Sequence, residues 1–236
     1  MNEINITENN FSEENVLYLY DSLSGIVGET GGGAFVETDD ARTRLKLVFP
    51  EKYDDLIRCE AEDKIADVIA VKYKYEFFGK KLKTEGLSPL EKEILFSALI
   101  AADLTDDKRY IIRKLRSFAE YTIDGTYNFR LAPLRRKWED VVGYIPSYFP
   151  PCRLTDFVSY LVGEKSGSKV TVENGKVYDK HYNLLNRTAL TGKTDDGRII
   201  REVILSECGD LRLLTPVSEK DDEYLKKYFA GRISFS

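Results

Sequence analysis

The chain has 236 residues, with 35 Lys and Arg against 40 Asp and Glu, which gives a formal net charge of -5. This charge argues against a protein that binds nucleic acid indiscriminately. No window approaches the roughly 18 apolar residues of a membrane span, and residues 1–4 lack the basic and apolar regions that begin a signal peptide. We therefore expect a cytoplasmic protein.

The cysteine content favours the same compartment. Cys59, Cys152 and Cys208 are odd in number, widely spaced and without a C-x-x-C partner. Such thiols are typical of reduced proteins, so we expect no disulfide framework and mostly buried side chains.

The N-terminal quarter is predicted to be rich in strands. Aromatic and β-branched content predicts strands at residues 16–20 and 34–36, and alternating polarity predicts another at 45–49. Before them lies an acidic head that we expect to be frayed, with Glu3, Glu8, Glu13 and Glu14.

A glycine-rich segment at residues 25–33 raises the possibility of a phosphate-binding loop. It contains neither G-x-x-x-x-G-K-[ST] nor G-x-G-x-x-G, and a predicted strand follows it instead of a helix. The sequence therefore favours a mobile hairpin loop over a phosphate site.

The middle of the chain is predicted to be helical. Pro50 begins a long helix that reaches about Leu82, with an aromatic-rich end that we assign to the core. Ser88-Pro89-Leu90-Glu91 forms a capping box at the start of a second helix. Thr105 caps a third, and the short connection predicts an antiparallel helical hairpin over about 89–120.

The second half alternates between helices and strands. A helix with Leu134 and Trp138 on its apolar face also includes Phe129, and a break covers 144–151. Asn174-Gly175 predicts a two-residue hairpin turn within 169–179. The remaining predicted elements are short: helices from about 155 to 163, 199 to 208 and 218 to 229, and a strand at 211–214.

Strands near both ends with helices between them predict an α+β fold. We expect one domain over 1–236, with a strand-rich part (1–49), a helical part (50–165) and a final part (166–236) that holds the hairpin, a helix and a strand. In this arrangement the central helices cover the terminal strands, which combine or lie side by side. The predicted core includes Leu95, Leu99, Leu115 and Phe118.

No motif predicts a metal or cofactor site. Five aspartate pairs occur, but adjacent carboxylates diverge on a helix and face opposite sides of a strand. Several lie where acidic residues favour a helix N-terminus, so we interpret them as caps. The pairs are 39/40, 54/55, 106/107, 195/196 and 221/222.

Catalytic motifs are also lacking. His181 is the single histidine, which excludes a site with several histidine ligands and leaves one candidate base. No G-x-S-x-G elbow supplies a serine nucleophile, and Cys152 stands between Pro151 and Arg153 without a recognisable context. We interpret His181 as a surface residue and expect no catalytic residues and no cofactor.

Residues 108–137 carry nine Lys or Arg and two acids, a local charge of +7 that leaves -12 on the remainder. Two interpretations stay open. The arginines could be solvated or paired within the chain, for example Arg116 with Glu120, or they could form a patch for phosphates or an acidic partner. The candidate binding residues are Arg109, Arg113, Arg116, Arg130, Arg135 and Arg136.

Three short sequences, at residues 128–131 (Asn-Phe-Arg-Leu), 201–206 and 211–214, occur in an order that resembles the YtxC-like family. The resemblance covers about the last half of the chain and implies a link with endospore-forming bacteria, without an established activity. Two features depart from the family pattern, the proline-rich break after Trp138 and the final helix near residues 219–229. No catalytic residues carry over.

Two functions therefore remain. The first is a non-enzymatic interaction or accessory protein that meets a partner protein through its helical surface. The second is a binder of nucleic acid or of a phosphate ligand through residues 108–137. Their response to salt separates them, because binding to phosphates weakens steeply as salt increases.

Overall fold

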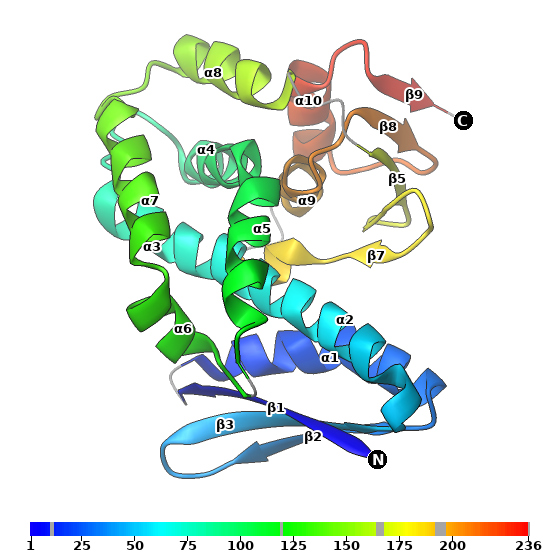
Figure 1. The fold of residues 1–236 in the computed structure, drawn as a ribbon. Coiled ribbons are helices and arrows are strands. Elements are labelled where there is room, and N and C mark those ends of the chain that lie inside the picture. Colours follow the sequence, from blue (N-terminus) through cyan, green and yellow to red (C-terminus); the bar gives the residue numbers. More distant parts are fainter. Residues whose placement is uncertain (10–11, 119, 164–167, 192–196, 236) are drawn as a thin grey trace. The chain divides into compact units, whose positions relative to one another are not determined.

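The computed structural model describes residues 1–9, 12–118, 120–163, 168–191 and 197–235 (Figure 1). The chain divides into two compact units, each assembled from separate segments. Unit 1 consists of Met1–Tyr73 and Thr105–Glu139, and unit 2 consists of Lys74–Leu104 and Asp140–Ser236. The expectation of a single domain stays a prediction.

Unit 1 contains a four-stranded sheet in the order β2-β3-β1-β4. β3 lies between β1 and β2 and is antiparallel to both, while β4 is parallel to β1. Alternation along β1 and β3 turns one face of the sheet inward, with Ile4 opposite Leu47 and Ile6 opposite Leu45. The strands are β1 (Asn2–Asn9), β2 (Gly33–Thr38), β3 (Arg42–Phe49) and β4 (Tyr121–Thr122).

Two predictions for the N-terminal part are wrong. The acidic head is not frayed, because β1 pairs along its whole length with β3. The predicted strand at 16–20 belongs to helix α1 (Glu13–Glu29), which packs on the sheet (Figure 1). Val16, Leu19, Leu23 and Val27 recur at helical spacing and are all buried, and this period of 3.6 outweighs the strand preference of the aromatic residues between them.

The long helix after Pro50 is confirmed and contains a π-helical turn that the sequence did not indicate. A short 3₁₀ turn, η2 (Glu51–Tyr53), precedes α2 (Asp54–Asp67). The π-helical turn η3 (Val68–Tyr73) follows, and α3 (Lys74–Lys81) completes the helix. Such turns rotate the residues after them relative to a regular helix.

Three further helices contribute to unit 1, namely α5 (Leu104–Leu115), α6 (Ile123–Arg130) and most of α7 (Ala132–Tyr144). Pro133 lies in the first turn of α7, where a missing N–H costs little. Leu134 and Trp138 on α7 are buried, as predicted. Phe129 was expected on the same apolar face, but it lies near the end of α6 with 82% of its surface exposed.

Unit 2 is organised around two buried helices. α4 (Pro89–Ala102) starts at the predicted capping box, in which Ser88 and Glu91 each accept the other's backbone N–H. Every residue of α9 (Arg198–Leu205) from Ile199 onward is buried. The other helices are α3, which completes the long helix after Pro50, together with α8 (Pro151–Gly163), α10 (Glu219–Tyr228) and the 3₁₀ helix η4 (Arg187–Thr191).

The sheet of unit 2 has the order β7-β6-β5-β8-β9. The predicted hairpin is confirmed, with Asn174 at φ 50° and Gly175 at φ 70° in the turn between β5 and β6. β8 is parallel to both β5 and β9. The strands are β5 (Lys169–Glu173), β6 (Lys176–Tyr178), β7 (Leu184–Leu185), β8 (Asp210–Leu213) and β9 (Ile233–Phe235).

The α+β class is confirmed, with the terminal strands in two separate sheets. Leu95, Leu99 and Leu115 are buried as predicted, whereas Phe118 is partly exposed. The antiparallel arrangement of α4 and α5 stays a prediction. Among the described residues, no helix is long and apolar enough to cross a membrane.

The expectation of mostly buried cysteines is wrong. All three are free thiols, but Cys59 and Cys152 are exposed and only Cys208 is buried. Burial raises the pKa of the Cys208 thiol to about 12, so this side chain stays protonated and unreactive.

Candidate functional site

The six predicted binding arginines lie on unit 1 but do not form one patch. Arg109 and Arg113 line a cleft between α5 and α7, and Arg130 lines a separate hollow beside α6. The other three do not line either cavity, and they are Arg116, Arg135 and Arg136.

The α5–α7 cleft has a volume of about 360 Å³ and a mixed lining. Its lining combines three cations and two acids with an aromatic and two apolar residues, namely Arg109, Arg113, Lys137, Asp106, Asp107, Tyr110, Pro133 and Leu134. At the rim, the Arg109 guanidinium lies 2.8 Å from the Asp106 carboxylate, and both side chains are more than half exposed. Such an exposed pair contributes at most ~1 kcal/mol, so Arg109 is able to exchange Asp106 for a ligand carboxylate.

The floor of the cleft is held by a buried carboxylate. Asp107 accepts a hydrogen bond from Trp138 Nε1 at 2.9 Å and pairs with Lys137 Nζ at 2.7 Å. Asp107 also lies in the first turn of α5, where an acidic residue is favoured, as predicted. Its negative charge offsets that of Lys137, so Lys137 adds little net positive charge to the cleft.

Arg113 is the cation that the cleft leaves available. Its side chain is exposed and makes no ion pair within the described ranges of the chain. The guanidinium lies 6.0 Å from the centre of the Tyr110 ring, and Lys114 Nζ approaches the same ring at 5.5 Å. Contacts of this kind at exposed sites contribute ~0.5–1 kcal/mol, which orients Arg113 without consuming its hydrogen-bond donors.

The hollow beside α6 has a different character. It encloses about 430 Å³ and is lined by Phe118, Phe129 and Arg130, with small polar residues such as Thr126 between them. Arg130 lies over the Phe118 ring, 5.6 Å from its centre. Arg130 thus covers part of the Phe118 ring, and Phe118 stays partly exposed because it also lines the hollow.

Two of the remaining arginines have structural contacts. Arg116 was expected to pair with Glu120, but its Nε lies 3.6 Å from Glu62 Oε2. Arg135 lies over the Tyr127 ring at 5.4 Å and donates to the Asn128 carbonyl at 3.0 Å. Arg136 is exposed and has no ion-pair partner in the part of the chain that the structure describes.

The glycine-rich segment has structural roles. Gly25 and Gly28 lie within α1, and the later glycines connect the C-terminus of α1 to β2. A Cβ atom on Gly32 would lie 2.2 Å from the Val48 carbonyl oxygen, so this position requires glycine. A helix C-terminus repels anions, which argues against a phosphate site here.

The other sequence candidates do not gather into a site. Over the described residues, no group of three or more His, Cys, Asp or Glu side chains is placed to hold a metal ion. His181 is exposed, as predicted, and its backbone N–H donates to Asp179. The aspartate pair at 195/196 lies outside the described residues.

Sequence reasoning missed two features of the α5–α7 cleft. Asp107 and Trp138 meet across 31 positions, and no local pattern connects them. Tyr110 was not singled out, although its spacing of three and four residues from Arg113 and Lys114 places all three on one side of a helix. That spacing was the available indication of a cation–aromatic cluster.

No protein-family model, curated protein or solved structure matches the chain. The YtxC-like resemblance therefore stays a prediction that rests on the short sequences that carry it. The geometry of the α5–α7 cleft is the firmest basis for a function.

Proposed function

We propose that the protein is a non-enzymatic interaction protein, and that its α5–α7 cleft binds an acidic segment of a partner protein. The observation that carries the proposal is Arg113, an exposed cation beside an apolar wall and without an ion-pair partner in the described segments. An acidic side chain of the partner pairs with Arg113. A neighbouring apolar side chain packs against Pro133 and Leu134.

The charge distribution favours a peptide over a nucleic-acid backbone. A nucleic acid needs cations in a row that follows its phosphates. In this protein the candidate arginines do not form such a row, because Arg116 pairs with Glu62 and Arg135 lies over the Tyr127 ring. Among the six candidate arginines, only Arg109 and Arg113 line one shared cavity, and of these two Arg109 already pairs with Asp106.

The chain's wider character supports an accessory role inside the cell. Cys59 and Cys152 are exposed free thiols, which is typical of a reducing compartment such as the cytoplasm. The YtxC-like resemblance supports a partner in an endospore-forming bacterium. No cofactor is needed for this function.

The test uses a library of short synthetic peptides that contain carboxylates next to leucine or phenylalanine, with binding followed by fluorescence anisotropy. We expect selective binding of a subset of the library. Arg113→Glu should weaken it by about tenfold or more, because a charge pair becomes a repulsion. Arg136→Glu is the matched control, and we expect a change within about twofold, since Arg136 does not line the cleft.

A labelled single-stranded DNA in the same assay separates the alternative function. Binding to DNA that weakens equally in Arg113→Glu and Arg136→Glu, and steeply with salt, would support the nucleic-acid alternative and contradict the peptide proposal. Selective peptide binding that Arg113→Glu does not weaken would also contradict it.

A further inference from the structure

Glu8 on β1 is completely buried, with 0% of its surface exposed. It lies on the inward face of the sheet, two residues after Ile6, where the alternation of β1 calls for an apolar side chain. A carboxylate in this position is costly unless it is paired with a cation or neutralised by a proton.

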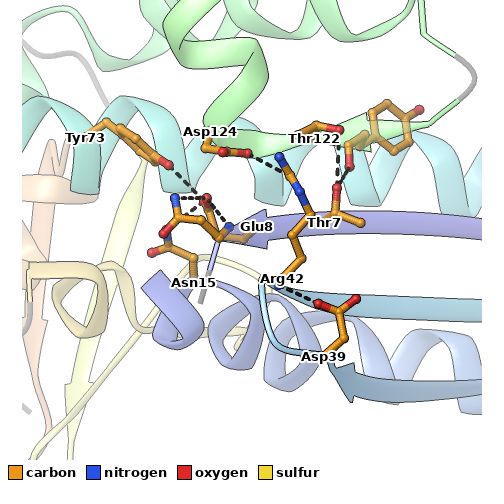
Figure 2. Close-up of polar contacts among 10 residues, drawn as sticks. Thr7, Glu8, Asn15, Asp39, Arg42, Tyr73, Thr122 and Asp124 are labelled. Atoms are coloured by element: carbon orange, nitrogen blue, oxygen red, sulfur yellow. Dashed lines mark hydrogen bonds and ion pairs between the residues drawn. The ribbon is translucent and has the colours of Figure 1, made fainter. Parts of the chain in front are cut away.

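Among the described residues, four donors surround the Glu8 carboxylate, and none of these is charged (Figure 2). Tyr73 Oη donates to Oε2 at 2.8 Å, and Asn15 Nδ2 donates to the same oxygen at 3.1 Å. The backbone N–H and side-chain Nδ2 of Asn9 both donate to Oε1 at 3.0 Å. These contacts join β1 to α1 and to the π-helical turn that carries Tyr73.

The nearby cations pair with other acids. Arg42 on β3 lies 3.3 Å from Asp124 on α6, and the Arg42 backbone N–H donates to Asp39 (Figure 2). On the other side, Lys72 of the π-helical turn pairs with Glu14 of α1. Burial raises the pKa of Glu8 against the effect of its donors, and the charge of Asp124 raises it further.

Asn15, which donates to Glu8 from α1, has a side-chain oxygen that is left without a hydrogen bond among the described residues. It is also fully buried, and its Oδ1 has no hydrogen-bond partner in the described structure. With the amide reversed, Oδ1 faces Glu8 and accepts a hydrogen bond from a protonated Oε2. The same two side chains therefore fit both forms of the acid, and each form leaves one end of the Asn15 amide without a partner.

We propose that Glu8 is a proton-binding site, and that Asn15 holds its acid and carboxylate forms through two opposite orientations of the side-chain amide. The proton comes from solvent and adds to Oε2, and Asn15 then changes from donor to acceptor. This proposal does not depend on the α5–α7 cleft.

Because Glu8 binds its proton more tightly in the folded protein than in the unfolded chain, the free energy of unfolding depends on pH in a definite direction. The carboxyl of Glu8 has its ordinary pKa of 4.5 in the unfolded chain and a raised pKa in the folded protein. The stabilisation from the bound proton is complete below 4.5 and is lost as pH rises through the folded pKa. Within that window one proton changes the unfolding equilibrium constant by at most about tenfold per pH unit.

Two variants and the wild type test the proposal by carboxyl ¹³C NMR on protein labelled at glutamate. We expect one side-chain carboxyl carbon with a midpoint above 4.5, absent in Glu8→Gln. Tyr73→Phe removes a donor to the carboxylate, so the midpoint should move still higher. If every glutamate carboxyl titrates near its ordinary value, or the raised midpoint persists in Glu8→Gln, the proposal is wrong.

Urea unfolding across the weakly acidic to neutral range provides the second readout. Glutamine resembles the protonated acid, since its Nε2 donates to Asn15 Oδ1. Because glutamine does not titrate, the contribution of position 8 to the free energy of unfolding should stay constant across the window in Glu8→Gln. The ratio of the wild-type to the Glu8→Gln unfolding constant should therefore rise as pH increases. A constant ratio would contradict the proposal, and if Glu8→Gln does not fold, Tyr73→Phe takes its place with a window shifted to higher pH.

Discussion

At the scale of single residues, Trp138 connects the candidate site to the core of unit 1. Its indole is buried and lies 6.1 Å from the Tyr127 ring, and Tyr127 in turn contacts Tyr73 at 4.4 Å. Its Nε1–H holds the buried carboxylate of Asp107, which fixes Lys137 at the floor of the cleft. The Trp138 side chain therefore both packs in the core of unit 1 and holds a residue of the cleft by a hydrogen bond.

Replacing Trp138 by phenylalanine keeps an aromatic ring but removes the donor to Asp107. We expect the free energy of unfolding to fall by ~1–3 kcal/mol or more, because a buried acceptor loses a partner and the smaller ring leaves a void. Urea unfolding followed by far-UV circular dichroism measures the loss. Phe129→Ala is the control, and its 82% exposure predicts a change within ~0.5 kcal/mol. Equal effects of the two variants would contradict the role of Trp138.

At the scale of elements, the glycines in α1 and in the turn after it show that one residue type has different structural roles at different positions. Gly25 lies on the exposed side of α1, where a Cβ atom would meet no other atom within 4 Å. Gly32 lies where the chain turns from α1 into β2, close to the Val48 carbonyl. One glycine is thus replaceable and the other is required.

Gly25→Ala should raise the free energy of unfolding by ~0.5–1 kcal/mol, because alanine favours a helix. Gly32→Ala should lower it by ~2 kcal/mol or more, because its Cβ would lie 2.2 Å from a backbone oxygen. Thermal unfolding of both variants measures the difference. If both substitutions were neutral, as expected for a mobile loop, the structural role of this segment would be wrong.

At the scale of the whole molecule, the open question is how the two units unfold. Each has its own sheet and its own buried residues. Unit 2 also contains a buried ion pair across 108 positions, Glu93 with Arg201 at 3.3 Å. Breaking a buried pair of this kind by removing one partner typically costs ~3–5 kcal/mol, so unit 2 depends on distant parts of the chain.

Leu99→Asp tests the expectation of a single domain. Leu99 is buried on α4 of unit 2, whereas Trp138, the one tryptophan of the chain, reports on unit 1. An unpaired charge at position 99 should destabilise unit 2 severely. If the protein is one cooperative domain, the urea midpoint from Trp138 fluorescence falls together with that from circular dichroism. A fluorescence midpoint equal to that of the wild type would show independent unfolding of the units.

The sequence by itself determined the elements whose boundaries depend on local chemistry. Ser88 and Glu91 cap α4, Asn174-Gly175 turns the β5–β6 hairpin, and Pro50 precedes the long helix, because caps and turns involve residues a few positions apart. The same local patterns supported the α+β class. They also located the arginines that border the α5–α7 cleft.

Only the tertiary structure decided which of these residues act together. The pairing of β4 with β1, the contact of Asp107 with Trp138 and the burial of Glu8 all join segments far apart in the chain. It also placed Arg116 beside Glu62 and left Arg113 facing the cleft. The physical reason is that burial and ion pairing depend on distance in space, whereas periodicity and capping depend on distance along the chain.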